Sequence, residues 1–436
     1  MFFTNVSLLF VLLFSLQTVT FSQGDKKSKT GARKITDKIT YTFLDINNIA
    51  TYFYNNGKSD ITPNGNSGFE YPKGTGKHAV FASGLLWGAK VAGDPNPRVG
   101  GTVYRTGLQP GIIQSDGTAA DPLSDKYRIY RVRPDVYPGG PTVDFTSDAK
   151  IESATPEALR ADYEKNWTEW PVDLGAPFTD KNNNGTYEPS VDVPGFPGAD
   201  QTIWFVANDL NQELTTKLYG ANPLGIELQA TIWAYNTPGA LSNMLFRKYK
   251  IINKTNVGSL TPITFDSMYI SMWNDIDLGD AGDDFVGVDT ILNLLYSYND
   301  NAVDEIYSPL PPPALGFDFI QGPLINGIAG EDRNKNGVDD AADFGIFNGQ
   351  KVGPGKINLP MTAAYYFAGG DPFIGDPPQG TIDGSRQFYN FIRGRYGIKG
   401  TPFINPLTGQ ETSFMLSGDP LTGIGWIDGI RLPSGR

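Results

Sequence analysis

The sequence predicts a mainly β protein: an antiparallel β-sandwich or jelly-roll-like body with long loops and two short helices. Two observations lead to this prediction. Runs of apolar and polar residues that alternate, and are rich in aliphatic and aromatic side chains, recur along the chain and end at Gly, Pro, Asn or Asp. The 436 residues also include 51 Gly and 32 Pro, a share that is typical of a folded chain with many loops rather than of low-complexity disorder.

The N-terminus, residues 1–22, has the character of a signal peptide. It contains no charged side chain, and its apolar run at 6–14 is too short to span a bilayer. Thr20 and Ser22 are small residues placed as a cleavage site before Gln23 requires. The basic segment that follows, 23–40, is expected to be a flexible leader. We therefore expect an exported protein that keeps no membrane-spanning segment after cleavage.

Strand signals are densest in residues 200–300, which we expect to form the core strands of the sandwich. The clearest alternation lies in 226–235 and in 245–251, where Arg247 interrupts the apolar face. Residues 126–132 are expected to form an edge strand. Further strands are expected at 79–91, 202–207, 265–273 and 291–298.

Two helices are expected between the strands. The first, at 156–167, begins after a capping Thr155 and carries an apolar stripe of Leu159, Tyr163 and Trp167. The second is expected at 385–395, where Phe388 and Ile392 are one turn apart. With the strands, these helices suggest three regions after the leader: a β-rich lobe, the sandwich core and a loop-rich lobe, at 41–199, 200–300 and 301–436.

Composition excludes several kinds of site. The chain has no Cys, which rules out disulfides, thiolate metal sites and a cysteine nucleophile, and its one His, His78, disfavours zinc or iron centres. The 47 acidic and 35 basic residues give a net charge of −12, which disfavours nucleic-acid binding and favours divalent cations. No serine-hydrolase, phosphate-loop or zinc-protease motif occurs.

Residues 180–192 match the beginning of a calcium-binding loop. The pattern D-x-[DN]-x-[DN]-G places side-chain oxygens at alternate positions, and Gly185 permits the sharp turn that brings them together. Position 12 is Val191 and prolines flank the loop, so we expect a free-standing loop rather than an EF-hand. The expected ligands are Asp180, Asn182, Asn184, the carbonyl of Thr186, Glu188 and Asp192.

A second copy of the pattern begins at Asp332 and has an acidic residue at position 12. Two such loops in an acidic, exported chain predict calcium as the cofactor. The alternative is a pair of Asx turns that hold no metal. The expected ligands of the second loop are Asp332, Asn334, Asn336, the carbonyl of Val338, Asp340 and Asp343.

A third acidic stretch, 275–289, carries six carboxylates and no Lys or Arg: Asp275, Asp277, Asp280, Asp283, Asp284 and Asp289. A solvated rim, a further cation site and catalysis all remain open. For catalysis, Asp275, Asp277 and Asp280 have the E-x-D-x-x-E spacing of β-jelly-roll endoglucanases, with Asp in place of Glu. Tryptophans offer a second route to sugars, by stacking, although core burial is the commoner role.

Six stretches spread over the mature chain carry a further signal: 66–74, 81–85, 170–177, 201–204, 275–289 and 358–362. Together they resemble a family of large secreted surface proteins that diderm bacteria export by the type IX route. The resemblance implies no assigned reaction. It implies an extracellular or outer-surface location and, because members end in a sorting domain, that this chain is an N-terminal fragment.

These observations lead to two functional hypotheses. The first is a secreted, calcium-binding surface or matrix protein of structural or adhesive type, without catalysis, whose partners are other surface or matrix components. The second is an extracellular glycan-active protein, either a glycoside hydrolase that uses the acidic stretch or a carbohydrate-binding module. Neither hypothesis includes nucleic-acid binding or membrane insertion.

Overall fold

Two antiparallel sheets pack face to face at the centre of the structure, a computed structural model that describes residues 39–327, 344–353 and 355–429. The strands of one sheet lie in the order β12 (Leu245–Asn253), β11 (Ile226–Ala234) and β10 (Gln201–Asn208), with β6 (Gln109–Pro110) and β7 (Tyr130–Val132) on the far edge of β10. In the other sheet, β4 (His78–Val91) pairs with β13 (Phe265–Ile276), β3 (Phe69–Glu70) and β5 (Arg98–Gly101). The mainly β prediction is confirmed.

The main core lies between these sheets. Alternate residues of β11, from Ile226 to Ala234, point inward and meet Leu85, Trp87 and Ala89 of β4. Every residue of β10 is buried, because this strand has a covered surface on both sides. Ile203, Phe205 and Ala207 enter the main core, whereas Trp204 and Val206 pack on the opposite side.

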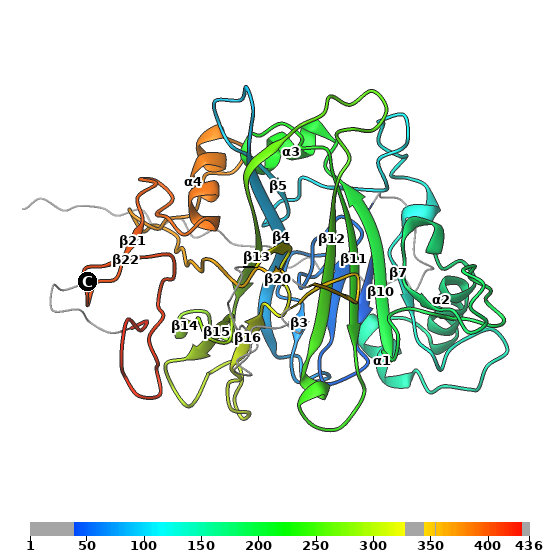
Figure 1. Ribbon diagram of the computed structural model, residues 1–436. Coiled ribbons are helices and arrows are strands. Elements are labelled where there is room, and N and C mark those ends of the chain that lie inside the picture. Colours follow the sequence, from blue (N-terminus) through cyan, green and yellow to red (C-terminus); the bar gives the residue numbers. More distant parts are fainter. Residues whose placement is uncertain (1–38, 328–343, 354, 430–436) are drawn as a thin grey trace, which may run out of the picture. The chain divides into compact units, whose positions relative to one another are not determined.

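Helices pack against both sheets (Figure 1). Helices α3 (Gln212–Tyr219) and α4 (Ile382–Ile392) supply apolar side chains to the outer side of β4 and β13. Helix α2 (Pro156–Thr168) packs against β7, and α1 (Thr146–Glu152) packs against α2. The described residues thus contain four α-helices, two more than predicted.

The two predicted helices are confirmed in kind, with shifted ends. The Oγ1 of Thr155 caps α2 by accepting a hydrogen bond from the N–H of Ala158 at 3.2 Å, and the predicted stripe is buried. Helix α4 starts three residues earlier than predicted, because the Oγ1 of Thr381 caps it through the N–H of Gly384 at 3.0 Å.

Smaller sheets and 3₁₀ turns surround the sandwich. A three-stranded sheet contains β14 (Asp284–Asp289), β15 (Leu294–Asn299) and β16 (Leu315–Asp318). The two-stranded sheets are β1 (Tyr41–Leu44) with β2 (Thr51–Tyr54), β8 (Phe178–Thr179) with β9 (Val193–Pro194), β17 (Leu324–Asn326) with β20 (Lys356–Asn358), β18 (Gly345–Phe347) with β19 (Gln350–Val352), and β21 (Phe403–Ile404) with β22 (Glu411–Thr412). The 3₁₀ turns are η1 (Asp125–Tyr127), η2 (Val172–Leu174) and η3 (Ala240–Asn243).

The bounds of two predicted strands need correction. The predicted edge strand at 126–132 is reduced to β7, because its first residues form η1. The strand expected from 291 begins only at Leu294, after a turn. Strand β4 pairs with β13 along most of its length, so segments from both sides of residue 200 share one sheet.

Candidate functional site

The predicted calcium loop at 180–192 is the hairpin loop between β8 and β9. Its side chains at positions 3, 5 and 9 gather together: the amide nitrogens of Asn182 and Asn184 donate to Oε2 of Glu188 at 2.7 and 2.6 Å. At position 1, Oδ2 of Asp180 accepts the N–H of Gly185 at 2.7 Å. Gly185 has a φ of +76°, the left-handed conformation that the sharp turn demands.

Asp192 closes the loop at its base. Its Oδ1 accepts the N–H of Lys181 at 2.9 Å and its Oδ2 accepts the N–H of Glu188 at 2.8 Å. The side chain is only 1% exposed. Because this side chain is buried at the base, we assign Asp192 to holding the loop shape rather than to the group that offers oxygens at the exposed tip. Thr186, expected to offer its carbonyl, donates its N–H to Oδ1 of Asn184 at 2.7 Å.

The donor set of this loop fits calcium. Carboxylate and amide oxygens are the ligands that calcium prefers, and an oxygen that accepts one N–H keeps a second lone pair. Hydrogen bonds from the backbone, above all from Gly185, hold the pKa of the Asp180 carboxyl below its usual value, so this side chain is charged at neutral pH. Neither Asp180 nor Glu188 forms a salt bridge within the described part of the chain.

The second predicted loop lies outside the described residues, so the structure gives no geometry for it. This applies to all of its expected ligands: Asp332, Asn334, Asn336, Val338, Asp340 and Asp343.

The third acidic stretch, 275–289, divides among separate places. Asp280 and Asp289 each form an Asx turn: Oδ1 of Asp280 accepts the N–H of Gly282 at 3.0 Å, and Oδ1 of Asp289 accepts the N–H of Ile291 at 2.8 Å. These two carboxylates therefore have local structural roles.

Asp275 and Asp277 lie at the end of β13 beside Tyr104. Burial and the neighbouring carboxylates of Asp277 and Asp376 together raise the pKa of Asp275 to about 6, against a hydrogen bond from the Tyr104 hydroxyl. The ring of Tyr104 packs edge-on against Trp273 at 4.5 Å. This corner, built from Tyr104, Asp275, Asp277 and Asp376, holds one carboxyl that is partly protonated near neutral pH.

Asp283 and Asp284 lie at the start of β14, where their neighbours are Asn299 and Asp304. Asp284 lies directly opposite Asn299 in the β14–β15 register, and the oxygens Oδ1 of both side chains are buried without a hydrogen-bond partner. The amide nitrogen of Asn299 donates to Oδ1 of Asp283 at 2.9 Å and to Oδ2 of Asp304 at 3.3 Å. Two buried oxygens without donors, on residues that pair across the strands, call for a cation or a proton.

These three places are not carboxylate-only metal centres. In the residues that the structure describes, no group of three His, Cys, Asp or Glu side chains could hold a metal ion. A calcium site in the loop at 180–188, or one at the start of β14 beside Asn299, would thus depend on the amide oxygens of Asn.

Four of the tryptophans do not offer stacking faces for sugars. Three of them are core residues that are at most 3% exposed: Trp87, Trp204 and Trp273. Trp233 is sandwiched between two rings, Phe196 at 3.9 Å and Phe246 at 5.4 Å, both nearly parallel to it. The stacking form of the carbohydrate hypothesis therefore receives no support from these residues.

A buried charged cluster, which the sequence did not reveal, joins α1 and α2 to the sandwich. Arg131 on β7 is 2% exposed and donates to Glu152 at 2.5 Å and Asp162 at 3.1 Å. Asp45 is 1% exposed and has one carboxylate oxygen without a partner, while Gln201 donates to the other at 3.0 Å. No sequence signal marks this cluster, because its members come from distant segments.

Glu152 gives this cluster a pH-dependent stability. Burial, opposed by Arg131 and reinforced by Asp45, raises the pKa of Glu152 to about 7. Above about pH 4.3 the unfolded state has released this proton, whereas the folded state keeps it up to about pH 7. The free energy of unfolding therefore falls by roughly 1–3 kcal/mol as pH rises between these two values. Urea unfolding at several pH values measures this slope.

The control for this prediction is Glu152→Gln, which keeps the side-chain shape and removes the titration. The other ionisable groups that act on Glu152 are Arg131, Asp45, Asp162 and Tyr52. They remain in the variant, so the difference between the two slopes isolates Glu152. Identical slopes in the two proteins would contradict the prediction.

Comparison with protein-family models, with curated proteins and with solved structures finds no match. Among the described residues, no helix has both the length and the apolar character needed to cross a membrane.

Proposed function

We propose that this chain is an exported, calcium-binding protein of the cell surface or extracellular matrix, with a structural or adhesive role. The observation that carries the proposal is the closed loop between β8 and β9. There Asn182 and Asn184 meet Glu188, next to the charged carboxylate of Asp180, and no basic side chain of the described protein pairs with either acid. A divalent cation would balance this charge.

The role of calcium would be to hold a long loop. The backbone bonds of Asp192 already fix the base of the loop, so an ion bound by Asp180, Asn182, Asn184 and Glu188 would fix its tip. Such sites in extracellular modules bind calcium with dissociation constants of about 10⁻⁴–10⁻³ M. This affinity suits a structural ion outside the cell rather than a sensor.

A second calcium position is proposed at the start of β14. The unpartnered oxygens of Asp284 and Asn299 belong to residues that pair across two strands, and the carboxylates of Asp283 and Asp304 accept from the amide nitrogen of Asn299. A cation there would satisfy both oxygens at once. It would tie the three-stranded sheet to the turn at Leu278, whose N–H binds the other oxygen of Asp284 at 2.9 Å.

Export and the surface location stay proposals that the sequence supports. They depend on the signal-like residues 1–22 and on the resemblance to type IX surface proteins. Other surface or matrix components are the partners that this proposal implies.

Calcium binding is expected to raise the free energy of unfolding by about 2.7 kcal/mol for each site at a calcium concentration of a hundred times its dissociation constant. Thermal melting with calcium and then with chelator measures the effect, and titration calorimetry counts the ions. Asp180→Ala is expected to remove one bound ion.

The matched control is Asp116→Ala. Asp116 also forms an Asx turn, through the N–H of Thr118 at 2.9 Å, but lies outside any calcium pattern. Equal melting midpoints in calcium and chelator would refute the proposal, and an ion count that Asp180→Ala leaves unchanged would refute the assignment to this loop.

The corner at Asp275 favours a second candidate function, glycoside hydrolysis. A carboxyl with a raised pKa beside other carboxylates is what a general acid requires, and here Asp277 and Asp376 surround Asp275. Asp280, part of the sequence motif, instead belongs to a turn.

Release of reducing sugar from neutral polysaccharides tests this candidate. Asp275→Asn is expected to lower the rate by about 10²-fold or more, because it removes the proton donor. Asp289→Asn, a change in a turn of the same acidic stretch, should leave the rate unaltered. Activity that survives Asp275→Asn would exclude this corner as the active site.

A further inference from the structure

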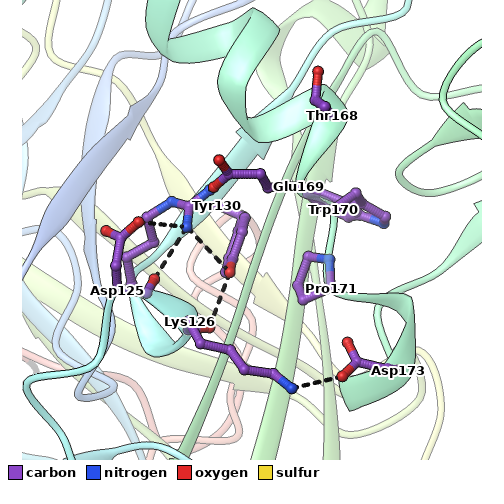
Figure 2. A pocket seen from close by; sticks show the side chains of 9 residues that line it. Asp125, Lys126, Tyr130, Thr168, Glu169, Trp170, Pro171 and Asp173 are labelled. Atoms are coloured by element: carbon purple, nitrogen blue, oxygen red, sulfur yellow. Dashed lines mark hydrogen bonds and ion pairs between the residues drawn. The ribbon is translucent and has the colours of Figure 1, made fainter.

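A pocket of about 380 Å³ lies between η1, the C-terminal end of α2 and η2. Figure 2 shows the carboxylates of Asp125, Glu169 and Asp173 at separate points around Tyr130, Trp170 and Pro171. The volume is at the lower end of the range that small-molecule sites occupy. None of the calcium positions or the carboxylates of the Asp275 corner lines this pocket.

Arg128 makes the base of the pocket rigid. Its guanidinium lies over the ring of Tyr130, 4.0 Å from the centroid, and donates to Asn166 at 3.2 Å, Asp125 at 3.1 Å and Glu169 at 2.8 Å. The side chain is 12% exposed. A guanidinium held on several sides keeps its neighbours in place before any ligand arrives.

Hydrogen-bond acceptors surround this base. Asp125 and Glu169 each use one oxygen for Arg128, and Asp173 uses one for Lys126 at 2.7 Å. The second oxygen of each carboxylate has no hydrogen-bond partner in the described part of the chain. These three side chains are about half exposed or more, at 49–65%, so their ion pairs contribute little to stability and tolerate a competing ligand.

The charges of the pocket narrow the class of ligand. Three carboxylates meet three cationic groups: Lys126, Arg128 and Lys165, which donates to Asp125 at 2.8 Å from outside the lining. Arg128 already directs its donors at the protein. Because these cations are paired, the groups left free are carboxylate oxygens. An anionic ligand would meet repulsion from these oxygens, and a purely apolar one would strip water from the carboxylates without replacing it. A ligand that fits must donate several hydrogen bonds, accept a few, and carry no net negative charge.

We propose that this pocket binds a neutral carbohydrate unit of a glycan. Its hydroxyl groups would donate to the second oxygens of Asp125, Glu169 and Asp173 and accept from the ammonium of Lys126. The proposal deepens the glycan-active alternative in its binding form. It requires no hydrolysis and no calcium.

Binding is expected to be weak, with a dissociation constant of about 1 mM, because the pocket is shallow and its polar groups are hydrated. Saturation-transfer NMR and titration calorimetry on the whole chain test it with four neutral probes: cellotetraose, mannotetraose, xylotetraose and the N-acetylglucosamine tetramer. At least one probe is expected to bind, and the double variant Glu169→Gln/Asp173→Asn should weaken it tenfold or more.

The control is Glu213→Gln, which removes a similar exposed acid on α3, paired with Lys217 at 2.5 Å. It should leave binding unchanged, and circular dichroism should show the same fold in all variants. Absence of binding for all four probes, or full binding by the double variant, would overturn the proposal. So would preference for tetragalacturonate or for a chitosan tetramer, which would point to an anion or an amine site.

Running every titration in calcium and again in chelator separates the carbohydrate proposal from the calcium proposal. Equal melting midpoints in calcium and in chelator would refute calcium binding. The carbohydrate result would be unaffected, because it measures binding at a pocket that contains no calcium ligands. Sugar release likewise plays no part in the test.

Discussion

Replacing Asp60 with Asn, or Arg247 with Met, is expected to lower the free energy of unfolding by about 3–5 kcal/mol, because each change leaves a buried charge without its partner. Asp60 is fully buried, and its Oδ2 accepts from Arg247 at 2.7 Å. Its Oδ1 accepts from the hydroxyl of Thr51 at 2.7 Å, and the guanidinium of Arg247 lies 5.0 Å from the ring of Phe53. Urea unfolding measures the loss.

A double-mutant cycle separates the pair from the other contacts. The double variant Asp60→Asn/Arg247→Met should cost much less than the sum of the single changes, since no unpaired charge remains. Asn is chosen because Asp60 has a φ of +64°, a conformation that Asn tolerates. The exposed pair Glu213 and Lys217 is the control, expected to contribute at most about 0.5 kcal/mol. Strictly additive losses would show that the pair is not a coupled unit.

This ion pair marks how far the sequence could predict the fold. The alternation in β12 was visible and the strand was found, with Arg247 noted as an interruption of its apolar face. Its partner lies 187 positions away, after β2, and nothing local in the sequence connects the two. Period-two patterns reveal which residues face a core, but not which charges meet inside it.

The same limit applies to the candidate sites: local patterns are visible in the sequence, whereas contacts between distant segments are not. The calcium pattern at 180–188 is local, so residue spacing alone pointed to this loop, where the amide nitrogens of Asn182 and Asn184 donate to Glu188. Calcium binding by the loop stays a prediction. The acidic stretch at 275–289 was misleading in sequence, because turns and strand pairing send neighbouring carboxylates to different partners. The pocket beside Arg128 has no motif, since η1, α2 and η2 build it together.

The two unpredicted helices differ in how visible they were. Helix α3 carries recognisable signals, because Asn211 caps its start through the N–H of Leu214 at 3.2 Å and Gly220 ends it with a φ of +70°. Helix α1 has only seven residues and no side-chain cap, and just one of them, Ala149, is buried. Its position depends on packing against α2, which a sequence pattern does not show.

Phe388→Ala is the second change with a large expected effect, a loss of about 3–5 kcal/mol. Phe388 is fully buried at the centre of the α4 contact, with the rings of Tyr219, Tyr365 and Phe367 at 5.1, 6.1 and 6.0 Å. Removing its ring leaves a cavity that three aromatic neighbours are too rigid to fill. Calorimetric or urea unfolding measures the loss.

Ile382→Ala on the same helix is the matched control, because its side chain is 43% exposed and its removal should change stability by no more than about 0.5 kcal/mol.

The number of unfolding transitions then shows how tightly α4 is joined to the sandwich. Gly88 of β4 lies against Tyr389 and Ile392 so closely that an added Cβ would come within 2.9 Å of both. With contact this tight, α4 and the β4–β13 sheet should unfold in one step, and a separate early transition in Phe388→Ala would contradict that coupling.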